Sequence, residues 1–365
     1  MDALLYTIKI IVYFLIIFLF YIVANKFRTK RSFLFLSIIL CILFGLYSVW
    51  CGKYPYVSDR KNFAFRFEDT TGQYDSFVMN ESLGLYGLES ILHLFTYDAT
   101  VLFFSVSFLF MLITMLAYRE SSRSTPFSFL FLLLSGYPIF SFYMLKQCMA
   151  MAFISLGYGF FTRGKKIRSF LCLIVAILFH EVAWIVVPLL LALKLGKNRC
   201  LKSFLLIIMA LVTIFFQKIN VFMLSVASRI IPSLKGQISS YLDKAGSISS
   251  SGSGIVTVFK GLPFYYLFGV AIKERKRLSA VYEGYDDYLI TTAFVSMSIV
   301  LSGFMYWMFR FGLIFYMPVS DFSSIIYSSL ETRKEKALFV LFTIFLPLLL
   351  SLRLMSQYFF YYGGI

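Results

Sequence analysis

Ionisable and amide side chains inside long apolar runs are the residues of this chain best suited to chemistry. Five of them stand out, namely Lys146, Gln147, His180, Glu181 and Arg310. A charged group at the middle of a bilayer costs ~2.5–3.5 kcal/mol on insertion scales, so such a group usually faces a polar cavity or extends to the interface. In a cavity, cationic groups bind anions, and imidazole and carboxylate groups transfer protons. The five residues therefore predict a shared polar site.

The ionisable residues also have structural explanations. Lys146 and Arg310 can extend along apolar surface to phosphate headgroups. His180 at a helix break can satisfy backbone groups that the break leaves without partners, and Glu181 can interact with the dipole at the start of the next helix. His93, the second of two histidines, lies among aromatic residues and is expected to be structural.

Composition determines which elements must position these residues. Of the 365 residues, 60% are hydrophobic and 20% are aromatic, and apolar runs recur throughout the chain. Open sheet edges are excluded from lipid, so helices are the expected spanning elements. We therefore predict an all-α, polytopic integral membrane protein that forms a single transmembrane domain over residues 1–365. Five cysteines without a close pair predict neither a disulfide framework nor a zinc site.

The formal charge of +16 comes largely from short basic clusters between apolar runs. Such clusters are typical of cytoplasmic loops under the positive-inside rule, and nucleic acid is not an expected partner. The clusters are "KFRTKR" (26–31), "RGKKIR" (163–168), "KLGKNRC" (194–200), "KERKR" (273–277) and "RKEK" (333–336).

Placing these clusters in the cytoplasm predicts about ten transmembrane helices with the N-terminus outside. The first apolar run has no convincing cleavage site and is interpreted as a retained span. The expected spans are 3–25, 33–51, 99–118, 126–142, 147–162, 203–217, 255–272, 288–304, 311–328 and 337–354.

The apolar stretch 169–193 has basic clusters at both ends, so a single crossing would place one cluster outside. We interpret it as a re-entrant hairpin of two half-helices with its tip at His180 and Glu181, because irregular backbone at membrane depth is tolerated when it is buried or lines a wet cavity.

Two larger outer loops are expected. Residues 52–98 are rich in acidic groups, and residues 218–254 contain an interfacial helix and a flexible linker. This topology places all five polar residues at tips facing the outer half of the membrane, near loop 52–98.

Three segments resemble the EpsG-like and Wzy-type polysaccharide polymerases. Residues 146–190 carry "KQ" at the opening of a span rich in small residues and "FHEVA" after a basic turn, where the family has an Arg-Gln pair and a Phe-His-x-Ser/Ala stretch. Residues 56–69, "YVSDRKNFAFRFED", resemble the family's first outer segment, and residues 307–317, "WMFRFGLIFYM", resemble its later arginine-bearing element. The resemblance extends over about residues 50–330. Lys146 keeps the positive charge of the family's arginine but lacks its planar fork.

The resemblance implies inverting glycosyl transfer at the outer face of the bacterial inner membrane. One undecaprenyl-diphosphate-linked oligosaccharide gives its glycan to the terminal sugar hydroxyl of another, and undecaprenyl diphosphate leaves. Expected catalytic residues are His180, Glu181 or Asp59, one of which takes the proton of the attacking hydroxyl. The residues expected to bind the diphosphate are Lys146, Gln147, Arg310, Arg60, Arg66 and Arg229.

The donor needs no nucleotide, so no metal or other cofactor is implied. The expected partners are the lipid-linked oligosaccharides, the lipid bilayer, and a chain-length regulator and flippase of the same pathway. Two alternatives remain open. A flippase for the same lipid-linked sugars would also use discontinuous helices and buried charges, and an O-antigen ligase-type glycosyltransferase would transfer the finished chain.

Overall fold

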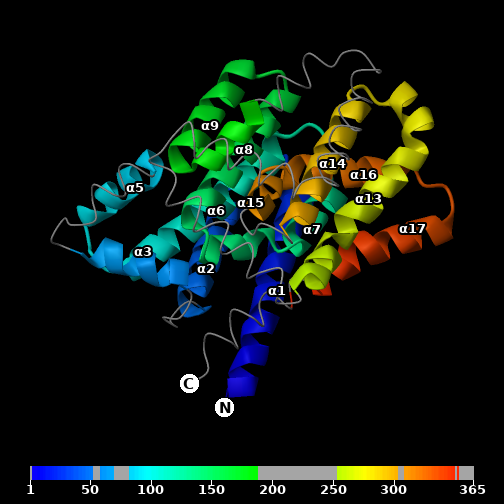
Figure 1. The fold of residues 1–365 in the computed structure, drawn as a ribbon. Helices are drawn as coiled ribbons and strands as arrows, with labels where there is room; N and C mark the ends of the chain where they lie inside the picture. Colours follow the sequence, from blue (N-terminus) through cyan, green and yellow to red (C-terminus); the bar gives the residue numbers. More distant parts are fainter. Residues whose placement is uncertain are drawn as a thin grey trace, which may run out of the picture. The chain divides into compact units, whose positions relative to one another are not determined.

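The structure is a computed structural model, and its described part is entirely helical (Figure 1). It describes residues 2–51, 58–69, 82–187, 253–302, 308–349 and 352. No strand occurs within these residues, so the predicted all-α class is confirmed. The chain divides into two compact units. Unit 1 comprises Met1–Trp184, Tyr316–Ile325 and Ile344–Ile365, and unit 2 comprises Ile185–Phe315 and Ile326–Thr343.

Three helices of unit 1 are long and apolar enough to cross a membrane. They are α1 (Asp2–Phe27), α2 (Ser32–Cys51) and α6 (Ala99–Glu120), and they coincide with three of the expected spans. Together with the recurring apolar runs of the sequence, they identify a membrane protein. The carboxylate of Asp98 caps α6 by accepting a hydrogen bond from the Thr100 backbone N–H at 2.8 Å.

The described part of the predicted outer loop 52–98 contains two short helices. These are α3 (Ser58–Glu68) and α5 (Leu83–His93), and Ser82 caps α5 through the Leu85 backbone N–H. Neither helix is long enough to span a bilayer.

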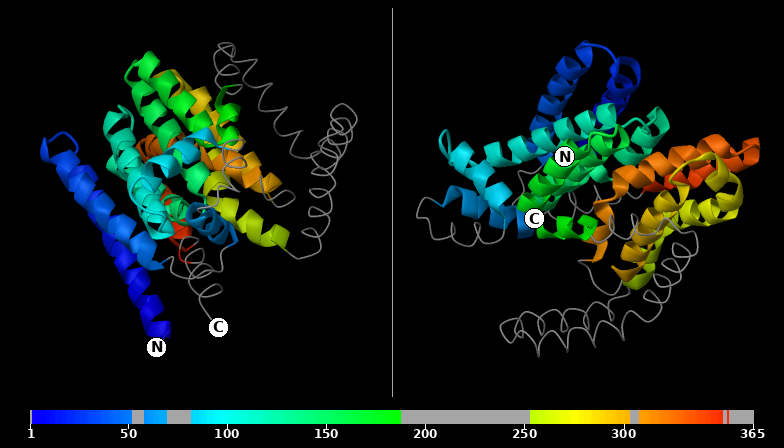
Figure 2. Two further views of the ribbon diagram at one scale, coloured as in Figure 1. Left: turned by 90° about the vertical axis from the view of Figure 1, so that its left-hand side faces the viewer. Right: turned by 90° about the horizontal axis from the view of Figure 1, so that it is seen from above.

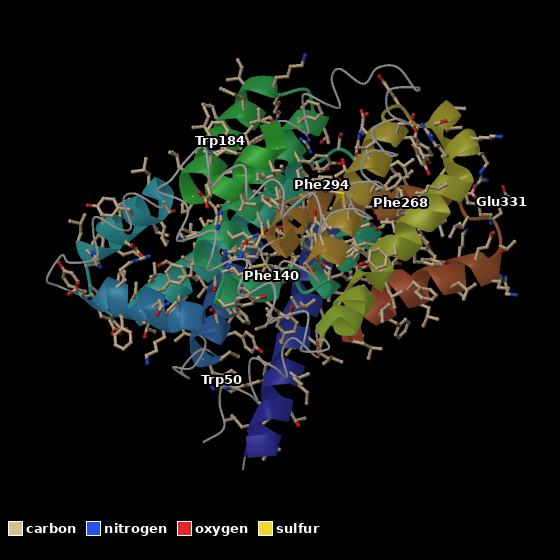
Figure 3. All side chains as sticks on the ribbon, viewed as in Figure 1. Trp50, Phe140, Trp184, Phe268, Phe294 and Glu331 are labelled. Carbon is tan, nitrogen blue, oxygen red and sulfur yellow. The ribbon has the colours of Figure 1, made fainter. Side chains whose placement is uncertain are left out.

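The predicted span 126–142 is wrong as a continuous helix. It consists of α7 (Pro126–Leu134) followed by the 3-10 helix η1 (Tyr137–Phe142). Gly136 separates them with a φ of 82°, a left-handed conformation that glycine adopts without steric cost. Every residue of η1 is buried, so this second part of the predicted span runs through the interior of unit 1. Phe140 of η1 is labelled in Figure 3.

A helical hairpin follows η1, and its first helix is largely buried within unit 1. It consists of α8 (Leu145–Thr162) and α9 (Lys166–Phe179), which are joined by a short turn and pack along one another (Figure 2). Helix α9 ends at Phe179, His180 is extended, and the 3-10 helix η2 (Glu181–Ile185) follows. A helix break at the predicted hairpin tip is therefore present, whereas residues 188–193 of the hairpin lie outside the described residues.

Basic residues gather where α1, α6 and α8 end and α9 begins. Arg28 donates to the carbonyl oxygens of Tyr118 at 2.7 Å, of Ser124 at 2.5 Å and of Ser121. Lys165 pairs with Glu120 at 2.8 Å. We call this region the basic end of unit 1. Its residues come from two of the basic clusters that the positive-inside rule places in the cytoplasm.

Unit 2 contains α13 (Ser253–Val281), α14 (Tyr285–Leu301), α15 (Met308–Leu313) and α17 (Arg333–Val340). The π-helix η4 (Leu341–Phe345) begins in unit 2 and ends in unit 1. Helix α16 (Tyr316–Ser329) begins in unit 1 and ends in unit 2. The predicted span 311–328 is therefore interrupted between α15 and α16. The predicted span 203–217 and nearly all of the predicted loop 218–254 lie outside the described residues.

Helices α13 and α14 of unit 2 are joined by polar contacts. The Tyr285 hydroxyl donates to the Ala271 carbonyl at 2.7 Å, and Arg275 pairs with Asp286 at 2.9 Å. A stacked pair of rings, Tyr266 and Phe342, links α13 to η4 at a centroid distance of 4.4 Å.

Candidate functional site

The opposite end of unit 1 collects most of the residues singled out by the sequence. Helices α3 and α5, the start of α8 and the end of α9 meet there, as the contacts below show. We call it the α3 end and define it by Arg60, Arg66, Glu89, Lys146 and His180. In Figure 1, α3 and α5 are the two short helices that follow α2 along the chain.

A buried ion pair joins the two short helices of the α3 end. Arg66 of α3 donates through Nη2 to Oε1 of Glu89 of α5, and the side chains of these residues are 10% and 6% exposed. The Arg66 guanidinium also lies 4.9 Å from the Phe63 ring centroid. Because removing one partner of a buried pair leaves an uncompensated charge, this pair fixes α3 on α5.

Glu89 lies in a strongly electrostatic environment. Burial raises the pKa of its carboxyl, whereas the charges of Arg66, His93 and Lys146 act in the opposite direction. Lys146, in the first turn of α8, is therefore close enough to act on the carboxylate. The structure brings Lys146 and Arg66, both predicted as diphosphate ligands, to one buried acid.

His93 is held by its surroundings in the way the sequence predicts. Its Nε2 lies 2.9 Å from the Phe67 carbonyl oxygen and must donate the hydrogen bond. Its ring packs against those of Phe67 and Tyr97, with centroid distances of 4.3 and 4.5 Å. These contacts assign His93 a structural role between α3 and the end of α5.

Arg60 is a second buried cation on α3. Its guanidinium lies 3.8 Å from the Phe103 ring centroid and donates to the carbonyl oxygens of Phe142 at 2.8 Å and Ser48 at 3.5 Å. Burial lowers its pKa to about 10, so it remains charged at neutral pH. Its Nε is buried without a hydrogen-bond partner, and no carboxylate among the described side chains lies within salt-bridge distance of Arg60. A buried charge with no described counter-ion is suited to an anionic ligand.

The segment around His180 is anchored by α5. The Ser82 hydroxyl donates to the Phe179 carbonyl at 2.6 Å, and Gly84 lies so close to the Phe179 ring that a Cβ there would come within 2.8 Å. The Val182 backbone N–H donates to Nδ1 of His180 at 3.1 Å. Nδ1 is therefore an acceptor, and in the neutral imidazole the proton sits on Nε2. In this geometry His180 is a hydrogen-bond donor at Nε2.

The remaining predicted residues are distributed more widely. Glu181 is exposed in the first turn of η2, and Gln147 is buried in the first turn of α8. Asp59 belongs to α3, but its side chain is not among those described. Arg310 belongs to α15 in unit 2 and is not among the residues brought together within unit 1. Arg229 lies outside the described residues.

The buried carboxylate of Glu89 is the feature that sequence reasoning missed. It appeared only as one of several acids in the predicted loop 52–98. The helical spacing of Leu85 and Glu89 could have revealed it, because residues four apart share a helix face and Leu85 is fully buried. No group of three or more potential metal-ligating side chains occurs within the described ranges.

The arrangement of the α3 end can hold an anion with Arg60, Arg66 and Lys146, and can donate a hydrogen bond from His180. Among known proteins, the sequence profile of the EpsG family matches residues 65–363. That match contains α5, the α8–α9 hairpin and most of unit 2. No curated protein and no solved structure matches the chain significantly.

Proposed function

This chain belongs to the EpsG family, and from that premise we propose that it is a polysaccharide polymerase acting on lipid-linked sugars. The family match supports a polymerase-type glycosyltransferase role in the membrane. The substrates we propose are undecaprenyl-diphosphate-linked oligosaccharide repeat units, which the enzyme joins into a surface polysaccharide. The reaction takes place at the outer face of the bacterial inner membrane.

The proposed reaction is an inverting displacement. The terminal hydroxyl of the acceptor glycan attacks the anomeric carbon of the donor glycan, and the bond from that carbon to the phosphate oxygen breaks. Undecaprenyl diphosphate leaves with the electron pair, and a base takes the hydroxyl proton. Stabilising negative charge on the diphosphate is the main electrostatic requirement.

The observation that carries this proposal is the convergence at the α3 end of three cations, of which Arg60 is buried and Arg66 and Lys146 are partly buried. Arg60 and Arg66 lie six positions apart on α3, which is about 9 Å along a helix axis. Lys146 of α8 acts on the same carboxylate that Arg66 binds. Among the described side chains, Glu89 is the buried carboxylate that faces Arg66 and Lys146, and Arg60 has no described counter-ion, so the charges of the α3 end suit a polyanionic leaving group.

Individual roles follow from these positions. Lys146, Arg66 and Arg60 bind the diphosphate, and the buried amide of Gln147 supports them from the first turn of α8. Nε2 of His180 donates a hydrogen bond that orients the acceptor sugar or the departing phosphate. Arg310 and Arg229 remain proposed further ligands. Ammonium and guanidinium groups supply the positive charge, so the proposed mechanism needs no metal.

The membrane topology is part of the same proposal. The basic end of unit 1 faces the cytoplasm, the α3 end faces outward, and residues 169–193 return as a re-entrant hairpin. The helix break at His180 supports the hairpin, because it divides the apolar stretch where the polar pair lies.

Reconstitution tests the function directly. Purified protein in liposomes that contain lipid-linked repeat units should produce glycans of increasing length in the presence of EDTA. The matched control is the variant Lys146→Ala at equal membrane abundance. Transfer of unextended repeat units across the bilayer, without longer glycans, would identify a flippase. Transfer of preformed chains to another acceptor, without elongation, would identify a ligase.

A further inference from the structure

We propose that Glu89 is the base that accepts the proton of the attacking hydroxyl, and that the arriving diphosphate activates it by drawing Arg66 away. This inference rests on the proposed function and assigns its missing proton acceptor. Glu89 belongs to α5, a helix too short to span the membrane, at the end of unit 1 that holds the proposed diphosphate ligands.

The register of α5 places Glu89 in line with the N-cap residue Ser82, which contacts the end of α9. Ser82, Leu85 and Glu89 follow the spacing i, i+3 and i+7, which is one face of a helix. Ser82 binds the carbonyl that precedes His180. Glu89 is seven positions further along, about 10 Å by helical rise. A substrate held between the hydrogen-bond donor His180 and the cations of α3 therefore lies along this face.

Two of the other candidate bases, His180 and Glu181, fit the role less well. The Nδ1 lone pair of His180 accepts the Val182 N–H, so this atom is not available for a substrate proton. Glu181 is exposed at the start of η2. Glu89 is a buried carboxylate within the cationic cluster, where the proton must be removed while the diphosphate leaves.

A carboxylate paired with an arginine is a weak base, and the proposed substrate resolves this difficulty. The charged groups that face Glu89 are Arg66 from α3, Lys146 from α8 and His93 from α5 itself. All three act to lower its pKa, and burial acts to raise it. A diphosphate that binds Arg66 and Lys146 neutralises two of the opposing charges. The pKa of Glu89 then rises, which strengthens the base while the donor is in place.

The proton and electron balance is simple. The acceptor oxygen forms its bond to the anomeric carbon and releases its proton to the Glu89 carboxylate. The bond between the anomeric carbon and the phosphate oxygen breaks, and undecaprenyl diphosphate leaves with that electron pair. The neutral carboxyl then gives its proton to water, and Arg66 pairs again with the carboxylate when the diphosphate departs.

The test compares Glu89→Gln with Glu120→Gln in proteoliposomes containing lipid-linked repeat units. Glu120 is a matched control, because it is also paired with a cation, Lys165, but lies at the basic end. Glu89→Gln should slow elongation by about 10²–10⁴-fold, the usual contribution of a general base. Its KM for the lipid-linked donor should not increase, since the amide no longer competes for Arg66. Glu120→Gln should remain within about twofold of the unmodified chain.

The pH profile separates a base from a structural anchor. In the unmodified chain, kcat should rise with pH through an apparent pKa above the ordinary range of glutamate, because only the deprotonated carboxylate accepts the proton. Glu89→Gln should lose this acidic limb. A Glu89→Gln variant that elongates at the unmodified rate would overturn the proposal.

Loss of Glu89 also leaves Arg66 buried without its counter-ion, so Glu89→Asp provides a second route if Glu89→Gln does not fold. This variant keeps the charge and should slow elongation at least tenfold with an unchanged KM, because the shorter side chain misplaces the base. A folded Glu89→Asp with unmodified kcat would overturn the proposal. If the unmodified chain itself elongates nothing, the polymerase function fails instead.

Discussion

Two carboxylates are buried among the described side chains of unit 1, and they are satisfied in different ways. Asp321 of α16 is fully buried and accepts hydrogen bonds from the hydroxyls of Ser124 at 2.7 Å and Ser121 at 3.1 Å. Glu89 is paired with the guanidinium of Arg66. The first lies beside the last residues of α6, and the second beside α3, which contacts Phe103 in the first turns of α6 through Arg60. Because α6 has 22 residues, these regions are separated by about 25–30 Å.

This difference in partners indicates a different role for each region. The partners of Asp321 are neutral hydroxyls, among them those of Ser121 and Ser124 in the turn between α6 and α7, and Arg28 donates to backbone carbonyls of the same turn. All of these interactions remain within the protein and fix a turn. At the α3 end, Arg66 and Lys146 face one described buried acid, Glu89, and Arg60 has no described counter-ion, so the charges of this region suit an anionic ligand. Neutral donors are typical of a structural clamp, and excess cations are typical of an anion site.

The comparison of the two ends of unit 1 first predicts an all-or-none difference in labelling, because the two ends should be accessible from opposite sides of the membrane. Single cysteines placed in 163–168 should react with an impermeant thiol reagent only from the cytoplasmic side, and cysteines placed in 83–93 only from the outside. A re-entrant hairpin further requires that cysteines in 194–202 react from the same side as those in 163–168. The unmodified chain provides the background, and four of its cysteines are buried. Labelling of 163–168 and 194–202 from opposite faces would contradict the hairpin and the topology that follows it.

The largest effect on activity is expected at Lys146. Lys146→Ala should reduce polymer formation by more than about 100-fold, since removing one preorganised donor from a developing anion has an effect of this order. Lys146→Arg should retain much of the activity, because positive charge is the essential property. The measurement is glycan length and rate at equal membrane abundance. Full activity in the alanine variant would show that Lys146 only extends to the headgroups.

Two substitutions of His180 distinguish the roles of its two ring nitrogens. Asparagine can replace Nδ1 as the acceptor for the Val182 N–H but lacks a donor at the Nε2 position, whereas glutamine places an amide donor near Nε2. We expect His180→Asn to lose about 10²-fold in kcat and His180→Gln to lose less than about tenfold. Glu181→Gln should be nearly neutral and provides the control. An inactive His180→Gln beside an active His180→Asn would contradict the donor role.

Hydropathy predicts the parts of the fold that depend only on transfer from water to lipid. The spans α1, α2 and α6 were predicted within two residues at most ends, because each is a long apolar run bounded by polar residues. The break after Phe179 was also predicted, since a polar pair in an apolar stretch marks it. The break at Gly136 was not, because the residues on both sides are equally apolar and only backbone conformation distinguishes them.

The sequence predicts several residues of the candidate site, but it does not predict the contacts between them. Lys146 was identified because a charge in an apolar segment is costly, and Arg60 and Arg66 were identified through the resemblance of their outer segment to the family. Their relation to Glu89 could not be predicted, because the Arg66 and Glu89 contact joins two helices from positions 23 apart in sequence. The role of His180 depended on a single hydrogen bond to Nδ1, which no sequence pattern specifies.

At the basic end, substitution of Asp321 should affect stability rather than chemistry. Asp321→Asn replaces one acceptor oxygen by an amide donor that faces hydroxyl donors, so at least one of these groups must reorient or lose its hydrogen bond. We expect a loss of about 1–3 kcal/mol in the free energy of unfolding. Thermal unfolding in detergent measures the loss, and the rate per folded molecule should remain unchanged. A comparable loss of elongation rate in a stable protein would place Asp321 in the catalytic machinery.

The smallest effect is expected at Thr125, which belongs to the same turn. Its hydroxyl accepts from the Ser128 backbone N–H at 3.2 Å, and the Ser128 hydroxyl accepts from the Thr125 backbone N–H at 2.8 Å, which completes a capping box at the start of α7. Thr125→Ala removes half of this box and should cost about 1 kcal/mol of stability. Because the turn is also held by Arg28 and Asp321, the α3 end should keep its geometry, and elongation per folded molecule should be unchanged. If Thr125→Ala lowered the elongation rate per folded molecule as well as the stability, the two ends of unit 1 would be coupled. The separation between clamp and anion site would then be wrong.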